Sequence, residues 1–373
     1  MSEKLFTCIY CDICYNIDDE HCPKELIMRK IIYVSLSVLL IFALSVTALA
    51  LPLSAGTDAL DNCFIDGEAP KGYDYVAFSP KKGDDDTTKY PLMVWLHGMK
   101  SGTEKRAQLK WYEFSNWASD EYQARFANAG GCYLLAVRAS DESINSWTSN
   151  SCYKLMRTIE YYLSLNGDNI DTSRIYIGGY STGGSAVWDM ISQYDGYFAA
   201  AVPIAAIYLP TTQEMDKVTD TSIWMFASDN DPYEINQSDD AYERFNYLKT
   251  RTLRPEGLRI TTVSDARFAD NSKRYNLETF EIMWDAEHFI WEAVTYDMHL
   301  MDGVTPYPNC TTIDAAGNTI DFSDPSQGVI SWLSLQTNDP TPVQESDDTG
   351  FFAKIAAFFK SIINWFKTLF KIS

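Results

Sequence analysis

A serine between glycines lies near the middle of the chain, where residues 179–183 read GYSTG. This G-x-S-x-G pattern makes a very tight turn when a strand precedes it and a helix follows it, and the Ser side chain then projects from the end of the sheet. The apolar run 175–177 comes directly before it, and a helical pattern at 185–192 follows. Ser181 is therefore the candidate nucleophile, with a purely structural turn as the alternative.

A serine hydroxyl needs a base to accept its proton, and histidine is the usual one. The chain has four, His21, His97, His288 and His299. In the chain order nucleophile, acid, base, only the last two remain. His288 follows an apolar run at 280–284, where a loop can hold it over the sheet edge, so it is the preferred base. His299 lies among apolar residues and is better suited to packing.

The base in turn needs a carboxylate that fixes its tautomer. Asp229 and Asp231 both follow the apolar run 223–227, between the Ser and the His. The carboxyl ends of strands are where such sheets place their sites. Asp231 is the preferred acid and Asp229 the second choice, and for either the competing role is to cap the next helix.

Acyl transfer also needs N–H donors for the developing oxyanion. We expect the backbone N–H of Thr182, directly after the nucleophile, to be one donor. We expect the N–H of Met99, in the loop after the apolar run 92–96, to be the other. The residues expected to support the turn and this loop are Gly179, Gly183, His97 and Gly98.

Short apolar runs alternate with longer amphipathic stretches through residues 57–335. This alternation predicts a single α/β domain with a mostly parallel sheet. The expected strands are 73–78, 92–96, 133–137, 175–177, 200–204, 223–227 and 280–284, and the expected helices are 104–117, 152–165, 185–192, 239–248, 289–296 and 325–335.

Four segments, VWLHGMKSG, IYIGGYSTGG, FASDNDP and HFIWEAVTYD, together resemble the secreted esterase and predicted-peptidase branch of the α/β-hydrolases. The segments are close to those of feruloyl esterases and polyhydroxybutyrate depolymerase-like proteins, and the resemblance covers roughly residues 70–300. It implies an α/β-hydrolase fold with helices on both faces of the sheet. It also implies that Asp231 is the family's acid and that His288, with Trp291 three residues on, is its base. Met99 and Glu287 depart from the family pattern, which leaves the substrate open.

These residues predict a serine hydrolase that cleaves carboxylic esters through an acyl-enzyme, with no cofactor and no metal. The expected substrate is a small or polymeric ester, including plant-polysaccharide-linked esters and polyesters. Trp147, Trp188 and Trp291 are candidates for stacking on an aryl or sugar group, although core packing is the commoner role of buried tryptophan. Two alternatives remain, a serine peptidase of the same fold and a non-catalytic surface-binding protein on a hydrolase scaffold.

The chain has 51 Asp and Glu against 30 Lys and Arg, a net charge of −21. Nucleic-acid binding needs a basic surface to meet the phosphates. We therefore expect no nucleic-acid partner.

A bacterial-type signal peptide is predicted at residues 28–55. Met28 is followed by a basic pair, an uncharged apolar run and the small-residue pattern that ends at Ala50. Cleavage then falls between Ala50 and about Ala55, and the protein is secreted or attached to the cell surface. A retained membrane anchor is the alternative, because the run is about long enough to span a bilayer.

If Met28 is the true start, residues 1–27 are an untranslated extension. The competing interpretation is a metal or iron–sulfur site, because this segment has closely spaced thiols and one imidazole. Those side chains are Cys8, Cys11, Cys14, His21 and Cys22.

Four more cysteines follow the apolar run and would lie in an oxidising compartment. On local spacing we expect a disulfide between Cys132 and Cys152, which leaves Cys63 for Cys310. Free buried thiols are the alternative.

Residues 336–350 are polar, acidic and Pro-containing, which predicts a linker. Residues 351–373 have large aromatic and aliphatic side chains on one helical face and lysines on the other. A basic amphipathic helix of this kind is typical of a segment that lies in a membrane interface, so we expect contact with a membrane or cell envelope. Docking on its own domain is the alternative.

Overall fold

A computed structural model describes residues 58–338, apart from 83–85, 100–105, 107, 110–112, 127–129, 140–146, 148–150, 234–237, 265–285 and 301–302. The N-terminal segments at 1–27 and 28–55, the tail at 351–373 and most of the linker lie outside the described residues. The same is true of the strand expected at 280–284 and of six of the fourteen residues of the helix expected at 104–117.

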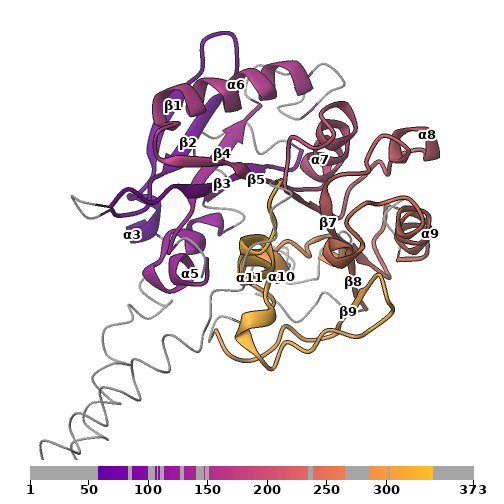
Figure 1. Ribbon diagram of the computed structural model, residues 1–373. Helices are drawn as coiled ribbons and strands as arrows, with labels where there is room; N and C mark the ends of the chain where they lie inside the picture. The colour runs from indigo at the N-terminus through magenta and orange to yellow at the C-terminus, as the bar shows by residue number, and fades with distance from the viewer. Residues whose placement is uncertain are drawn as a thin grey trace, which may run out of the picture. The chain divides into compact units, whose positions relative to one another are not determined.

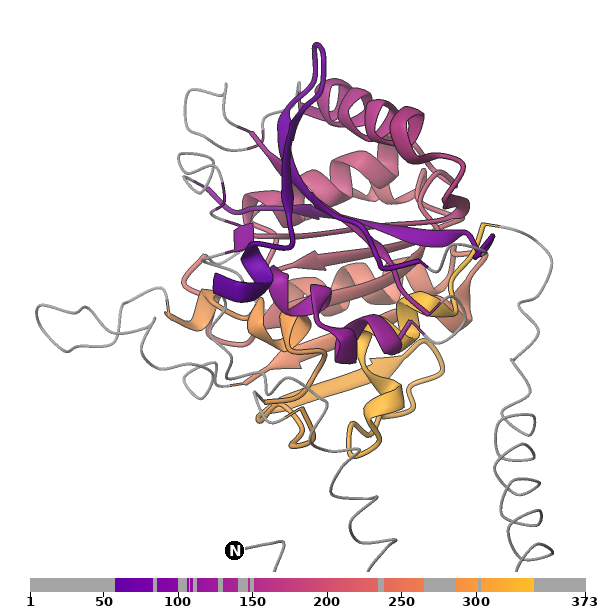
Figure 2. The ribbon, with the colours of Figure 1, turned by 90° about the vertical axis from the view of Figure 1, so that its left-hand side faces the viewer.

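The described part of the chain builds a nine-stranded sheet in the order β1-β2-β4-β3-β5-β6-β7-β8-β9. β3 to β8 are parallel to one another, whereas β1, β2 and β9 pair antiparallel. β1 and β9 therefore form opposite edges of the sheet, as Figure 2 shows. The strands are β1 (Ile65–Glu68), β2 (Asp74–Phe78), β3 (Tyr90–Leu96), β4 (Tyr133–Arg138), β5 (Ile170–Tyr180), β6 (Ala200–Ile204), β7 (Ser222–Ser228), β8 (Arg259–Val263) and β9 (Cys310–Asp314).

The central strands are buried on both faces. Every residue of β3, β6 and β7 is buried. Parallel sheets need such cover because their crossover helices pack on both sides. Successive side chains point to opposite faces, so Leu92 and Val94 enter one core cluster and Met93 and Trp95 enter the other.

Helices cover the sheet on both faces (Figure 1). One core cluster holds side chains of α6 (Ser151–Asn166), α7 (Thr182–Gln193) and α9 (Ser238–Lys249). The other holds side chains of η2 (Phe114–Ala118), α5 (Asp120–Ala124), α10 (Glu292–Thr295) and α11 (Val329–Ser334). The shorter elements are α3 (Asp58–Asp61), α8 (Thr212–Met215), η4 (Pro255–Gly257), η7 (Ala286–His288) and η8 (Pro325–Gln327). This strand order with two helical layers is the α/β-hydrolase fold, as expected.

Several elements differ from the expected ones. The sequence pattern did not indicate β1, β8 or β9, because these strands contain polar residues; β8 reads RITTV and β9 reads CTTID. The helix expected at 289–296 is only the four residues of α10, and that expected at 325–335 divides into η8 and α11. In the described part of 104–117, the structure has the start of η2.

Neither expected disulfide is present, because all four cysteines of the domain are free thiols. Cys132 and Cys152 belong to the core clusters on opposite faces of the sheet. Cys63 lies just before β1, whereas Cys310 begins β9 at the opposite edge. Burial raises the pKa of Cys152 and of Cys310 to about 12, so both are protonated thiols.

The domain continues three residues into the expected linker. The N–H of Asn338 donates to Ser173 O at 2.8 Å, and Arg254 donates to Thr337 O at 2.6 Å. These bonds hold the chain against β5 through Asn338.

Among the residues that the structure describes, every helix is too short or too polar to span a membrane.

Candidate active site

Ser181 lies at the turn between β5 and α7, with φ 59° and ψ −120°. A positive φ is uncommon for a residue with a side chain, and the surrounding structure must hold it. Here the Ser181 N–H donates to Ile204 O at 2.8 Å, and the Ser181 carbonyl accepts from Ser185 N at 3.0 Å. Both backbone groups are thus fixed by neighbours on β6 and α7.

The two glycines of this turn permit close backbone packing. A Cβ on Gly179 would lie 2.6 Å from Gly183 O, and one on Gly183 would lie 2.6 Å from His97 O and closer still to Leu96 O. A side chain at either position would therefore clash with backbone. The end of β3 thus lies directly against the first turn of α7.

The expected nucleophile, base and acid lie in one hydrogen-bonded series. His288 Nε2 is 2.9 Å from Ser181 Oγ, and His288 Nδ1 is 2.6 Å from Asp231 Oδ2. All three residues are buried, with 7%, 3% and 1% of the surface of Ser181, His288 and Asp231 exposed. Since a carboxylate only accepts, Nδ1 carries the proton and Nε2 is free to accept from the Ser hydroxyl. This arrangement can move a proton from Ser181 to His288.

The two candidate acids have different partners. Asp231 bonds His288 through Oδ2 and accepts the Tyr233 N–H through Oδ1 at 2.9 Å. Asp229 instead accepts a short hydrogen bond from Ser238, the first residue of α9. Asp229 is therefore bonded to a side chain at the start of α9, and Asp231 faces the imidazole.

Two tyrosines flank the imidazole of His288. The ring centroids of Tyr180 and Tyr233 lie 5.0 Å and 4.7 Å from it. Sequence reasoning did not identify either of them, although Tyr180 precedes the Ser and Tyr233 follows the acid by two positions. Their closeness in sequence to the proposed nucleophile and acid is the signal that could have identified them.

His97 is fully buried beside the site, at the end of β3. Its Nε2 accepts the Ala139 N–H at 3.0 Å, so its Nδ1 carries the proton and donates to Gly98 O at 2.7 Å. Its own carbonyl accepts from Trp147 Nε1 at 2.7 Å. Burial lowers the pKa of His97 to about 4, so it is neutral at physiological pH. These bonds brace the loop that carries Met99.

The two expected oxyanion donors come from segments next to the Ser181 turn. Thr182 is the first residue of α7. Met99 follows Gly98 after the end of β3, the segment that packs against Gly183. Its side chain is 46% exposed, so the described loop does not bury it in the core.

His299 lies apart from this series. It is fully buried, with Nδ1 2.7 Å from Asp297 O and Nε2 2.9 Å from Phe322 O. Both ring nitrogens face backbone carbonyls, which is a packing role.

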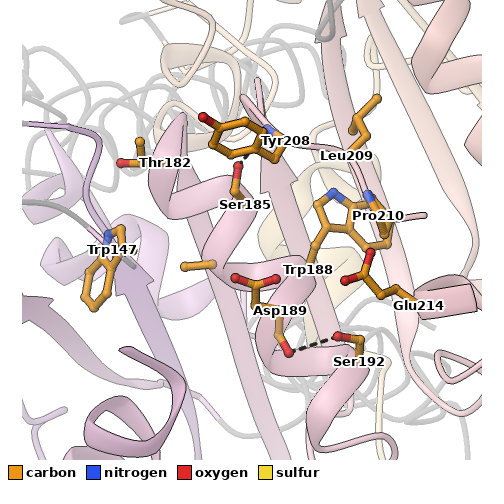
Figure 3. Close-up of a pocket in the computed structure, with 11 residues that line it drawn as sticks. Trp147, Thr182, Ser185, Trp188, Asp189, Ser192, Tyr208, Leu209, Pro210 and Glu214 are labelled. Carbon is orange, nitrogen blue, oxygen red and sulfur yellow. Dashed lines mark hydrogen bonds between the residues drawn. The ribbon is translucent and has the colours of Figure 1, made fainter. Parts of the chain in front are cut away.

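A cavity of about 320 Å³ opens along α7, beginning at Thr182 (Figure 3). Trp147 and Trp188 line it, whereas Trp291 packs its ring 4.7 Å from that of Tyr180. Of the three expected stacking residues, two therefore face the cavity.

Across the described residues, no group of three or more His, Cys, Asp or Glu could hold a metal ion.

Comparison with known proteins gives structural likeness only. No protein-family model matches the chain, and no curated protein sequence matches it significantly. The fold is similar to that of a thermostable esterase (24% identity, TM-score 0.49), covering 63% of this chain and 60% of that one. It is also similar to an acylaminoacyl peptidase from Pyrococcus horikoshii (15% identity, TM-score 0.36, 50% and 35% covered) and to an acetyl xylan esterase from Aspergillus awamori (13% identity, TM-score 0.38, 50% and 79% covered). The chain thus spans less than two thirds of the length of the first two.

Proposed function

We propose that this protein is a serine hydrolase that cleaves carboxylic esters through an acyl-enzyme. The observation that carries the proposal is the buried series Asp231, His288 and Ser181, with hydrogen bonds of 2.6 Å and 2.9 Å. Each member has the partner that its role needs: a carboxylate that accepts from Nδ1, an imidazole with a free Nε2, and a hydroxyl next to it.

In this mechanism Ser181 Oγ attacks the ester carbonyl while His288 Nε2 accepts its proton. Asp231 stabilises the resulting imidazolium. The N–H groups of Thr182 and Met99 donate to the tetrahedral oxyanion. His288 then gives its proton to the departing alcohol, and the same residues activate water to hydrolyse the acyl-serine.

The test uses a fluorophosphonate probe and short-chain para-nitrophenyl and feruloyl esters. We expect the probe to label Ser181 and the purified protein to hydrolyse the esters. Ser181→Ala should lose both the labelling and the hydrolysis. Ser164→Ala is the control, because Ser164 is exposed on α6 and does not line the cavity. Ester hydrolysis that survives in Ser181→Ala would reject the assignment.

The same experiment separates the two alternatives. A serine peptidase would label with the probe but prefer amide substrates in a parallel peptide panel. A non-catalytic binding protein would neither label nor turn over either substrate.

We further propose that the protein is exported and contacts a membrane or cell envelope through residues 351–373. The basic start at Met28 and the lysine-bearing amphipathic tail support this. N-terminal sequencing of the exported protein should begin between Ala50 and about Ala55. A chain that ends at Thr349 should lose binding to anionic vesicles, and unchanged binding would reject the role of the tail.

A further inference from the structure

The cavity along α7 extends from Thr182, the residue directly after the proposed nucleophile, to a pair of carboxylates. At one end it is lined by Thr182, whose N–H is the proposed oxyanion donor. Farther along, it is lined by Asp189 on α7 and by Glu214 on α8. Figure 3 draws both carboxylates among the side chains that line this hollow.

The two carboxylates have no cationic partner among the described residues. Neither Asp189 nor Glu214 takes part in any ion pair of that part of the chain. Glu214 accepts from the N–H and hydroxyl of Thr211 in the capping box of α8. Burial raises the pKa of Asp189, and the charge of Glu214 raises it further. A cation between them would offset both effects.

The electrostatics of the cavity change along its length. The N-terminus of α7, at Thr182, carries the positive end of the helix dipole, which suits a developing oxyanion. The negative end lies near Ser192, in the last turn, close to Asp189. A substrate that is negative at the carbonyl oxygen in the transition state and positive at its far end matches this polarity.

The length of the cavity limits what can reach the carboxylates. Asp189 is seven positions after Thr182, which is a rise of about 10 Å along the helix. Its side chain leans back toward the helix N-terminus, so the carboxylate is nearer than that. A flexible chain as long as a lysine or arginine side chain spans this distance. The indole of Trp188 and the ring of Tyr208 line the route and can pack on its methylenes and on the cation.

We propose that Asp189 and Glu214 select esters that carry a terminal ammonium or guanidinium group on a short aliphatic chain. This deepens the proposed function and depends on it, because the cavity has a role in specificity only if Ser181 is the nucleophile. Asp189 and Glu214 would bind the distant cation and not the reacting atoms.

The experiment compares kcat/KM for matched ester pairs that differ only by the charge. In one pair the cation is on the acyl group, as in the para-nitrophenyl esters of acetyl-lysine and acetyl-norleucine. In the other it is on the alcohol, as in aminopentyl and pentyl butanoate. We expect the cationic member of at least one pair to be favoured about tenfold, equivalent to about 1.4 kcal/mol. Added salt should reduce that preference.

Asp189→Asn and Glu214→Gln should each reduce the preference, and the double variant should remove it. Glu214→Gln retains a residue that can serve in the capping box. Glu256→Gln, an exposed position in η4, removes the same charge elsewhere and should leave the preference unchanged. Asp189→Lys should turn the preference toward an ester with a terminal carboxylate. Thermal unfolding checks that each variant is folded.

The outcomes are separable. If the wild-type protein hydrolyses both members of both pairs equally, or if the double variant keeps its preference, this specificity is wrong while the serine hydrolase stands. If no ester is hydrolysed and the fluorophosphonate probe does not label Ser181, the proposed function fails and the specificity fails with it.

Discussion

Two buried histidines stand at the carboxyl end of the sheet, and each has a partner on both ring nitrogens. His97 lies between two backbone groups, accepting from Ala139 N–H and donating to Gly98 O. His288 lies between two side chains, Asp231 and Ser181. The imidazoles are alike in burial but differ in whether their partners can exchange a proton.

This difference separates a structural imidazole from one that is suited to proton transfer. A backbone N–H cannot give up its proton and a carbonyl carries no charge to offset that of an imidazolium, so His97 is neutral at physiological pH. A serine hydroxyl can supply a proton, and an aspartate stabilises the imidazolium that results. Burial alone therefore does not identify a catalytic histidine; the chemistry of its partners does.

The largest expected effect comes from exchanging the two histidines for residues that cannot act as a base. His288→Ala should lower kcat for a para-nitrophenyl ester by about 10⁴- to 10⁶-fold, because no group remains to accept the Ser181 proton. His97→Asn should lower kcat far less and should instead reduce the free energy of unfolding by about 1–3 kcal/mol, because the Ala139 N–H loses its acceptor. Ester kinetics and urea unfolding measure the two quantities. Equal losses of kcat in both variants would contradict the distinction.

The acid gives the next largest effect. Asp231→Asn should lower kcat by about 10⁴-fold, because an amide cannot stabilise the imidazolium. The matched control is Asp229→Asn, two positions away, which changes only the bond to Ser238 and should cost about 1 kcal/mol of stability. The same ester assay measures both variants. If Asp229→Asn is the more damaging to kcat, the acid is misassigned.

The neutral state of His97 predicts a pH dependence of stability. Its pKa is about 4 in the folded protein, against 6.5 for the exposed group. The unfolded chain therefore binds more protons as pH falls, so the contribution is complete above about pH 6.5 and is lost as pH falls toward about 4. The loss amounts to about 3 kcal/mol.

Urea unfolding across that pH range tests the prediction. In His97→Asn this contribution is absent, so the stability gap between wild type and variant should narrow as pH falls. A gap that stays constant with pH would show that His97 does not titrate in this way.

The smallest effect concerns the ring beside His288. Tyr233→Ala removes an aromatic contact at 4.7 Å, and we expect kcat/KM to fall about three- to tenfold. Tyr233→Phe keeps the ring and should retain most of the wild-type kcat/KM. If the Phe variant is as impaired as the Ala variant, the hydroxyl and not the ring is the relevant group.

The elements that the sequence predicted well are those whose signal is local. Residues 175–183 combine an apolar strand with a glycine–serine turn. The chain order nucleophile, acid, base then reduced the number of histidines and carboxylates that could be the base and the acid. The strands β8 and β9 were not predicted, because their threonines are of a residue type that is usually exposed to solvent. In the structure Thr261 is buried, and its hydroxyl bonds Trp224 Nε1 at 2.7 Å and Thr312 Oγ1 at 2.6 Å.

What the sequence could not supply depends on orientation in three dimensions. The choice between Asp229 and Asp231 rests on which carboxylate turns toward the imidazole. The cysteine pairing was wrong because spacing along the chain does not report on which face of the sheet a thiol lies. The two acidic residues of the α7 cavity are 25 positions apart in the chain, and only the three-dimensional fold brings them to one hollow.

The hydrogen bonds of the proposed reaction centre join residues far apart in the chain, with sequence separations of 107 between Ser181 and His288 and 57 between Asp231 and His288. Closing such long loops is slow and comes after local helices form. Recovery of nucleophile reactivity during refolding therefore reports on completion of the whole sheet from β5 to β8. The site is in this sense a kinetic marker for the native topology, and a partly folded chain with native helices would remain unreactive.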